Sequence, residues 1–172
     1  MTNMSKLIAS FQVDHTRIGY GIFVSRRDIV NGAYITTFDI RMKRPNVEPA
    51  IHPNAMHTIE HVVATYLRSS KFKDHVVYWG PMGCLTGFYF ITNTAHAIMP
   101  REIEPLMRAA FRHQANYRGE VPGATPVNCG NYQLHDLAMA KYEAKVFLGQ
   151  KWKFDYPPAR RIKAGVRTFY DA

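Results

Sequence analysis

Residues 55–68 read AMHTIEHVVATYLR, which has the spacing of an amphipathic helix with reactive groups on its polar side. At about 100° per residue, His57 and His61 lie within roughly 40° of one another on such a helix, and Glu60 is beside them. The apolar residues of the stretch cluster on the opposite side: Ile59, Val62, Val63 and Tyr66. We therefore predict a helix that begins after an Asn54 cap, packs on a core and points two imidazoles into a cleft.

The rest of the chain alternates strand-like and helix-like runs. Runs of β-branched and aromatic residues predict four strands, at Gly19–Val24, Tyr34–Met42, Val76–Trp79 and Phe88–Thr92. Two more amphipathic runs predict helices that stop near Gly119 and Gly149, at about Glu102–Tyr117 and Leu134–Leu148. These elements indicate an α+β fold, with a mainly antiparallel sheet and about three helices packed on one face.

Composition limits the classes of function. The 172 residues are 47% apolar, which suits a single domain over residues 1–172. No run approaches the roughly 20 apolar residues of a membrane span, and the N-terminus lacks the apolar centre of a signal peptide, so we expect a cytoplasmic protein. The formal charge of +9 raises the question of nucleic-acid binding. Much of the excess falls late in the chain, where residues 150–172 form a basic tail, and a solvated basic face is the favoured interpretation.

Two cysteines complete the reactive set. Cytosolic thiols stay reduced, so Cys84 and Cys129 are better explained as a reactant and a ligand than as a disulfide. With His57 and His61, the Cys129 thiolate would give three protein ligands and leave a fourth position open, as in catalytic metal sites. Zn²⁺ and Fe²⁺ both accept this ligand set, and the spacing does not separate them.

Cys84 is then available for proton transfer. A nearby cation favours its thiolate form, and Glu60, beside the ligands, is a second proton carrier. A Lewis acid with two proton-transfer groups is what enolisation next to a carbonyl requires. The residues thus indicate an enzyme that moves hydrogens between neighbouring carbons.

Five ordered motifs make the chain resemble the S-ribosylhomocysteine lyase family, which makes the precursor of the autoinducer-2 signal. The resemblance covers most of residues 10–149. The motifs are SFQVDH at 10–15, FDIR at 38–41, HTIEH at 57–61 with Arg68 beyond it, PMGCLTGFY at 81–89, and Cys129-Gly130 followed by LHDL at 134–137.

The resemblance implies a homodimer with active sites at the subunit interface. It also implies one Fe²⁺ per subunit, with Zn²⁺ able to replace it. The implied reaction moves the ribose carbonyl of S-ribosylhomocysteine by two isomerisations. A β-elimination then yields homocysteine and 4,5-dihydroxy-2,3-pentanedione.

The resemblance further implies a role for each residue of the site. The metal ligands would be His57, His61 and Cys129. The acid–base pair would be Cys84 and Glu60. The ribose would be lined by Ser10, His15 and Arg41, and the homocysteine end held by Arg68.

The chain departs from the family pattern at two places. Tyr78 and Gly80 stand where the family usually has Asp and Ser, just before the Cys84 turn. Thr125-Pro126 replaces an Asn-Glu pair ahead of Cys129. These departures bear on substrate fit more than on metal binding.

Two other interpretations remain open from the sequence. An inverted zinc protease also uses His-x-x-Glu-His, and Glu143 would then be the third ligand. A small, basic, non-enzymatic module that binds a metal or nucleic acid is the second. It predicts salt-sensitive binding to nucleic acid and no thiol product.

Overall fold

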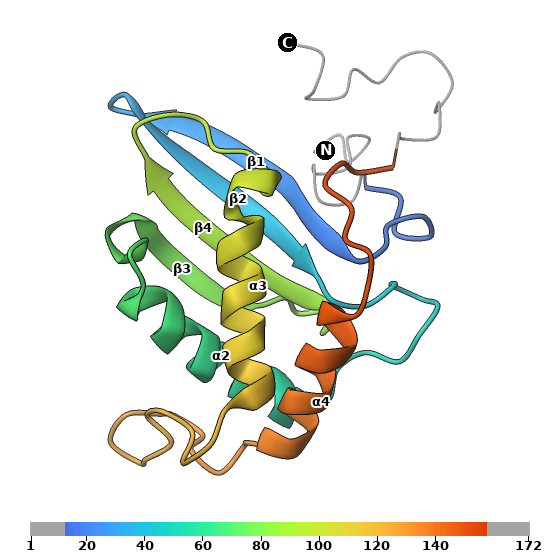
Figure 1. The fold of residues 1–172 in the computed structure, drawn as a ribbon, viewed down its shortest axis with the longest axis vertical. Helices are drawn as coiled ribbons and strands as arrows, with labels where there is room; N and C mark the ends of the chain where they lie inside the picture. Colours follow the sequence, from blue (N-terminus) through green and yellow to red (C-terminus); the bar gives the residue numbers. More distant parts are fainter. Residues whose placement is uncertain (1–12, 158–172) are drawn as a thin grey trace, which may run out of the picture.

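The computed structural model describes residues 13–157, which form a four-stranded sheet with three α-helices on one face (Figure 1). Ser10, with the rest of residues 1–12, and residues 158–172 lie outside the described residues. The elements are β1 (Gly21–Val30), β2 (Ala33–Arg41), α2 (Pro53–Ser69), the 3₁₀ turn η1 (Lys73–His75), β3 (Val76–Pro81), β4 (Gly87–Thr94), α3 (Pro100–Asn116) and α4 (Leu137–Leu148). The predicted α+β class is confirmed. None of the described helices is long and apolar enough to cross a membrane.

The sheet has the order β1-β2-β4-β3, and every neighbouring pair is antiparallel. A two-residue turn joins β1 to β2, with φ of 49° at Asn31 and 81° at Gly32. Asn-Gly is the pair that tolerates these left-handed angles best, and the turn matches the twist of the strands. β1 runs six residues beyond its predicted end at Val24, as a charged stretch with a register shift between Val24 and Arg26. Charged side chains are common on such edge strands. Because this stretch does not alternate between apolar and polar residues, the sequence pattern did not predict that the strand continues.

The helices begin and end at recognisable caps. The prediction of Asn54 as the first cap is wrong: α2 is capped by His52, because Pro53 takes the first helical position, where no N–H is needed. α4 starts later than predicted, at the Asp136 cap, whose carboxylate accepts from the Met139 N–H at 2.8 Å. Its end at Gly149 is confirmed.

The core lies between the sheet and the three helices. The apolar face predicted for the first helix is confirmed, since Ile59, Val62 and Val63 are fully buried. Phenylalanines from β2, β4, α3 and α4 form much of the core: Phe38, Phe88, Phe90, Phe111 and Phe147. This packing fixes the position of α2, and therefore the positions from which His57, Glu60 and His61 extend.

Residues 150–157 pack against the fold, although we assigned them to the tail; we call this segment the C-terminal strap. The Trp152 indole is 5% exposed and stacks on Phe147 with ring centroids 4.3 Å apart. Its Nε1 donates to the Phe147 carbonyl at 2.8 Å. Lys153 forms a parallel bridge with Gly21, where any side chain would meet the Lys153 backbone. The strap is thereby fixed along β1 (Figure 1).

We expect Trp152→Ala to lower the free energy of unfolding by about 3–5 kcal/mol, as for other large buried aromatic side chains. Urea denaturation followed by circular dichroism measures this change. Tyr142→Ala is the matched control, because Tyr142 is 58% exposed on α4 and should change stability by less than about 0.5 kcal/mol. Equal effects from the two variants would contradict the packing of the strap.

Candidate metal centre

Two imidazoles on α2 are held with one nitrogen each available. His57 Nδ1 lies 2.8 Å from the Leu134 carbonyl, and His61 Nδ1 lies 2.6 Å from the Pro122 carbonyl. A carbonyl only accepts, so each Nδ1 carries the proton and each Nε2 keeps its lone pair. The ring centroids are 4.5 Å apart and the rings are perpendicular, at 89°. This is the arrangement in which backbone carbonyls orient histidines for a metal.

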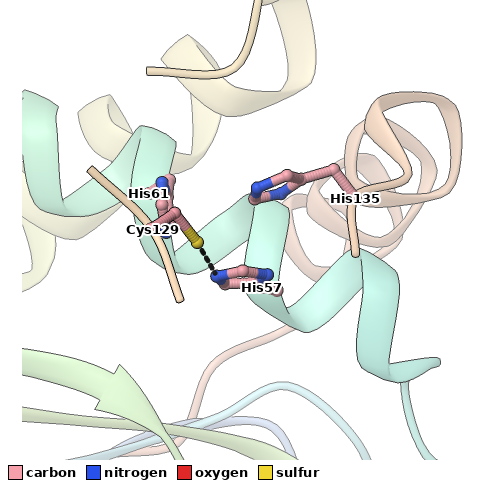
Figure 2. A group of neighbouring side chains, drawn as sticks. All are labelled: His57, His61, Cys129 and His135. Carbon is pink, nitrogen blue, oxygen red and sulfur yellow. Dashed lines mark hydrogen bonds between the residues drawn. The ribbon is translucent and has the colours of Figure 1, made fainter. Parts of the chain in front are cut away.

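Cys129 reaches the pair from a loop between α3 and α4. Its Sγ lies 3.4 Å from His57 Nε2, across 72 residues of sequence, as Figure 2 shows. The Asn131 N–H points to the same sulfur at 3.4 Å. The structure therefore brings together the three side chains that the sequence selected as ligands.

His135 is a fourth member that we did not select. The donor atoms of His57, His61, Cys129 and His135 all lie within 4.8 Å of one another. His135 Nδ1 lies 3.3 Å from the Thr58 hydroxyl, whose one hydrogen goes to the Asn54 carbonyl at 2.9 Å. His135 Nδ1 is therefore the donor, and Nε2 keeps its lone pair.

The buried Nε2 of His135 has no hydrogen-bond partner among the described residues. Burial, helped by the neighbouring His57 and His61, lowers the pKa of His135 to about 4. The ring is therefore neutral near pH 7 and keeps a lone pair beside the other donors.

Ring orientation separates His135 from the other donors. Its ring stacks on His57 with centroids 4.2 Å apart and planes only 19° apart (Figure 2). An imidazole binds a metal in its own plane, and two stacked rings cannot both aim at one ion in this way. His135 is better placed to hold the His57 ring. The LHDL motif was the sequence signal for His135, but stacking between distant segments could not be deduced from it.

The side chains present fit a divalent transition metal. Two imidazole nitrogens and one thiolate are ligands that Zn²⁺ and Fe²⁺ both accept. His57 and Cys129 also line an open cavity of about 500 Å³, which gives a small molecule access to them. Glu60, half-buried on α2, lies on the wall of the same cavity. Two side chains of the donor cluster, a carboxylate and open space therefore meet at one place.

Cys84 lies in the turn between β3 and β4. Its Sγ is 3.1 Å from the Thr86 Oγ1 and 3.7 Å from Arg41 Nη1. Arg41 Nη1 also donates to Thr86 Oγ1 at 2.6 Å, which leaves the Thr86 hydrogen for the sulfur. Cys84 does not itself line the cavity, but its neighbours Gly83 and Leu85 do.

These contacts change the acidity of the thiol. Burial of the sulfur raises the pKa of Cys84, but hydrogen bonds from the Thr86 side chain and backbone and the charge of Arg41 outweigh it. The net effect is a lowered pKa, so a larger fraction of Cys84 is thiolate near neutral pH.

An unperturbed cysteine thiol has a pKa of about 8.5 and is alkylated at half its maximal rate near that pH. We expect carboxamidomethylation of Cys84 to reach half its maximal rate at a lower pH. Thr86→Val should move this midpoint upward, because the sulfur loses a donor. Peptide mass spectrometry across a pH series follows the reaction. Thr94→Val is the control, since the Thr94 hydroxyl donates to the His96 carbonyl. If Thr86→Val left the pH midpoint of Cys84 alkylation unchanged, the Thr86 hydroxyl would not be a donor that stabilises the Cys84 thiolate.

Of the other predicted residues, Ser10 lies outside the described residues, and His15, Arg41 and Arg68 do not line the cavity. The His15 Nδ1 bonds to the Val13 carbonyl in its own turn, at 2.8 Å. Arg68 is exposed and donates to the carbonyls of Val76 and Val77, each at 3.3 Å. Among the described residues, neither of these side chains nor Arg41 lines the cavity.

The two departures from the family pattern have structural counterparts. The Tyr78 phenol lies over Gly80, and a Cβ at residue 80 would collide with it. A larger residue at position 80 would therefore require the exposed Tyr78 ring to move. The Thr125 carbonyl accepts from the N–H groups of Asn128 and Cys129, at 3.1 and 3.0 Å, so the turn that presents Cys129 forms with Thr125 in place.

Glu143 does not join the donor cluster. It is buried and paired with Lys43, with Nζ and Oε2 2.6 Å apart. Within residues 13–157, the cluster consists of three histidines and one cysteine. The inverted-protease interpretation therefore loses its third ligand.

Comparison with known proteins agrees with the geometry. A model of the S-ribosylhomocysteinase (LuxS) family matches residues 8–156, beyond the region that we recognised. The S-ribosylhomocysteine lyase of Phocaeicola vulgatus is 54% identical over 144 residues, 83% of this chain and 88% of the relative. That of Porphyromonas gingivalis is 53% identical over 142 residues, with 82% and 88% covered. That of Borreliella burgdorferi is 44% identical over 144 residues, with 83% and 90% covered. This chain belongs to the S-ribosylhomocysteinase (LuxS) family.

Proposed function

We infer that this protein is an S-ribosylhomocysteine lyase, a carbon–sulfur lyase that acts on a small molecule. The observation that carries this inference is the cluster of His57, His61 and Cys129, of which His57 and Cys129 line an open cavity together with Glu60. The products that we assign are homocysteine and 4,5-dihydroxy-2,3-pentanedione.

We assign His57, His61 and Cys129 as the ligands of one divalent metal per subunit, Fe²⁺ with Zn²⁺ as a substitute. When bound, such an ion supplies a Lewis acid that polarises a sugar oxygen. With each Nδ1 donating to a backbone carbonyl, each Nε2 can offer a lone pair to the ion, and the Cys129 sulfur would complete the set as a thiolate once the metal is bound. His135 supports the His57 ring from the side.

Cys84 and Glu60 are our candidates for proton transfer. Each isomerisation removes a proton from the carbon beside a carbonyl and returns one to the former carbonyl carbon. Once the carbonyl is on the third carbon, loss of the proton on the fourth breaks the bond between the fifth carbon and sulfur. Homocysteine leaves with its sulfur protonated. The enol that remains takes a proton on the fifth carbon and loses its hydroxyl proton, which gives 4,5-dihydroxy-2,3-pentanedione. The lowered pKa of Cys84 favours a base at this position. Glu60 lines the open cavity, and so do Gly83 and Leu85 on either side of Cys84.

Arg41 is our candidate for a ribose contact, with Ser10 and His15. Its guanidinium already lies beside the Cys84 sulfur, which supports a place near the reacting carbons. We assign Arg68 to the homocysteine end. We further propose a homodimer with sites at the subunit boundary, in which His15 of one chain could serve the cavity of the other. The cytoplasmic location stays a prediction.

The direct test is to incubate anaerobically purified, Fe²⁺-loaded protein with S-ribosylhomocysteine and to follow free thiol. We expect many turnovers, with one homocysteine released for each substrate consumed. The metal-free protein is the control and should be inactive. A fully loaded protein that releases no thiol would refute the function.

A further inference from the structure

A buried ion pair lies on the face of the sheet away from the helices. Asp39 and Arg41 are 2% and 3% exposed, on the side of β2 opposite to the core residues Phe38 and Ile40. Arg41 Nη2 lies 2.5 Å from Asp39 Oδ2, and Arg41 Nε lies 3.0 Å from Oδ1. Removal of two charges from water is costly unless their geometry is held, so neighbours of this pair matter.

The C-terminal strap supplies one of those neighbours. The Tyr156 hydroxyl donates to Asp39 Oδ2 at 2.9 Å, across 117 residues of sequence. Its ring stacks on Phe23 of β1, with centroids 4.7 Å apart and planes 11° apart. Phe23 is the cross-strand partner of Asp39, so the stacking sets the phenol beside the carboxylate. The Trp152 anchor described above fixes the strap close to this point.

The contacts form a continuous path from the strap to the reactive thiol. Tyr156 donates to Asp39, and Asp39 holds Arg41 by two hydrogen bonds. The remaining arm of Arg41 donates to Thr86 and lies beside the Cys84 sulfur. Since the planar guanidinium is rigid, the orientation of Asp39 decides where that arm points.

We propose that Tyr156 is a positioning residue for Cys84, and that it acts by fixing the Asp39–Arg41 pair. Its catalytic consequence rests on the proposed function, in which Cys84 transfers protons. The charged and titratable groups along the path of contacts from the strap to the Cys84 sulfur are Arg41, Asp39, Tyr156 and Tyr89. Tyr89 is the cross-strand partner of Asp39 on β4 and flanks the pair on its other side.

Without the Tyr156 hydroxyl, Asp39 Oδ2 loses one of its hydrogen-bond donors and keeps the bond from Arg41 Nη2. The carboxylate is then free to turn, and Arg41 follows it because their two hydrogen bonds move together. The arm beside Thr86 and Cys84 shifts with it, so the thiolate loses part of its stabilisation. The ring stacking on Phe23 survives in Tyr156→Phe, so the fold is retained.

The test compares Tyr156→Phe with Tyr20→Phe in the full, metal-loaded chain. The Tyr20 hydroxyl donates to Glu48 at 2.5 Å. Tyr20→Phe therefore removes a similar tyrosine–carboxylate hydrogen bond that lies outside the path from Tyr156 to Cys84. Carboxamidomethylation of Cys84 is measured against pH by peptide mass spectrometry, with kcat and KM measured in parallel.

For Tyr156→Phe we expect the alkylation rate at pH 7 to fall by about three- to tenfold, the effect of half to one pKa unit, with no change at pH 9.5. We expect kcat to fall by a similar factor, with KM within about twofold and metal content unchanged. Tyr20→Phe should match the wild type in all of these.

An alkylation profile that coincides with the wild type in Tyr156→Phe would overturn the proposal. Tyr156→Leu, which removes the ring as well, is the second variant. If only Tyr156→Leu shifts the profile, Tyr156 acts by packing and the positioning role is refuted. Alkylation needs no substrate. A shifted profile in a protein without lyase turnover would therefore refute the proposed function while it supports this inference.

Discussion

Cys129→Ala is expected to lose the divalent metal that the wild-type protein retains. The sulfur is one of three proposed ligands, and two imidazoles alone leave half of a tetrahedral ion without protein donors. We expect a loss of affinity above the 10–100-fold that removal of a ligand's supporting partner costs. Inductively coupled plasma mass spectrometry after loading and gel filtration measures the metal content per chain.

His135→Phe is the matched control for metal retention. Phenylalanine keeps a ring stacked on His57 but has no Nε2, so it separates support from ligation. We expect this variant to keep about one metal per chain, since its loss of affinity should stay within about 10–100-fold. Full retention by Cys129→Ala would contradict the ligand assignment. Metal loss by His135→Phe as complete as that of Cys129→Ala would make His135 a ligand.

Glu60→Gln and Cys84→Ala are expected to abolish most turnover while they keep the metal. Removal of a positioned acid or base costs about 10²–10⁴-fold in rate. Neither residue belongs to the donor cluster, so the metal content should stay as in the wild type. Release of homocysteine by each metal-loaded variant is followed with a thiol reagent.

Glu48→Gln is the control for the loss of a carboxylate. Glu48 accepts from Tyr20 and Arg44 and does not line the cavity, so its variant should turn over like the wild type. A Glu60→Gln or Cys84→Ala protein within tenfold of the wild-type rate would remove that residue from the acid–base pair.

Helical periodicity and donor chemistry predicted three of the four members of the donor cluster, His57, His61 and Cys129. Residues 57, 60 and 61 share one side of α2 because the helix repeats every 3.6 residues, and this needs no tertiary information. Cys129 was selected by its chemistry, as a second thiol on a loop of a chain that we expected to be cytoplasmic and therefore reduced. His135 was missed because its role depends on stacking against His57, which only the folded chain shows.

The errors in the predicted elements have local causes. Asn54 is a better capping residue than His52 by propensity, but Pro53 has no N–H and fits the first helical position. The charged half of β1 carries no apolar alternation, so the pattern ended at Val24. Backbone pairing with β2 extends this strand regardless of its side chains.

The face of β2 with Asp39 and Arg41 shows where sequence reasoning ends. Alternation along β2 puts both residues on the side opposite Phe38 and Ile40, which belong to the core. It did not predict that they are buried, because Tyr156 reaches them from the C-terminal strap, 117 residues from Asp39. Because the sequence after Gln150 is basic, we did not predict that Trp152 and Tyr156 pack against the fold.

X-ray absorption spectroscopy of the metal-loaded protein tests the central claim most directly, because it reads the atoms bound to the ion. We predict one sulfur at about 2.3 Å and two imidazole nitrogens near 2.0–2.1 Å in the zinc-loaded form, with oxygen from solvent or substrate completing the shell. The sulfur contribution should vanish in any residual metal bound by Cys129→Ala. A spectrum of the wild-type protein without sulfur, or with three or more imidazoles, would contradict the account.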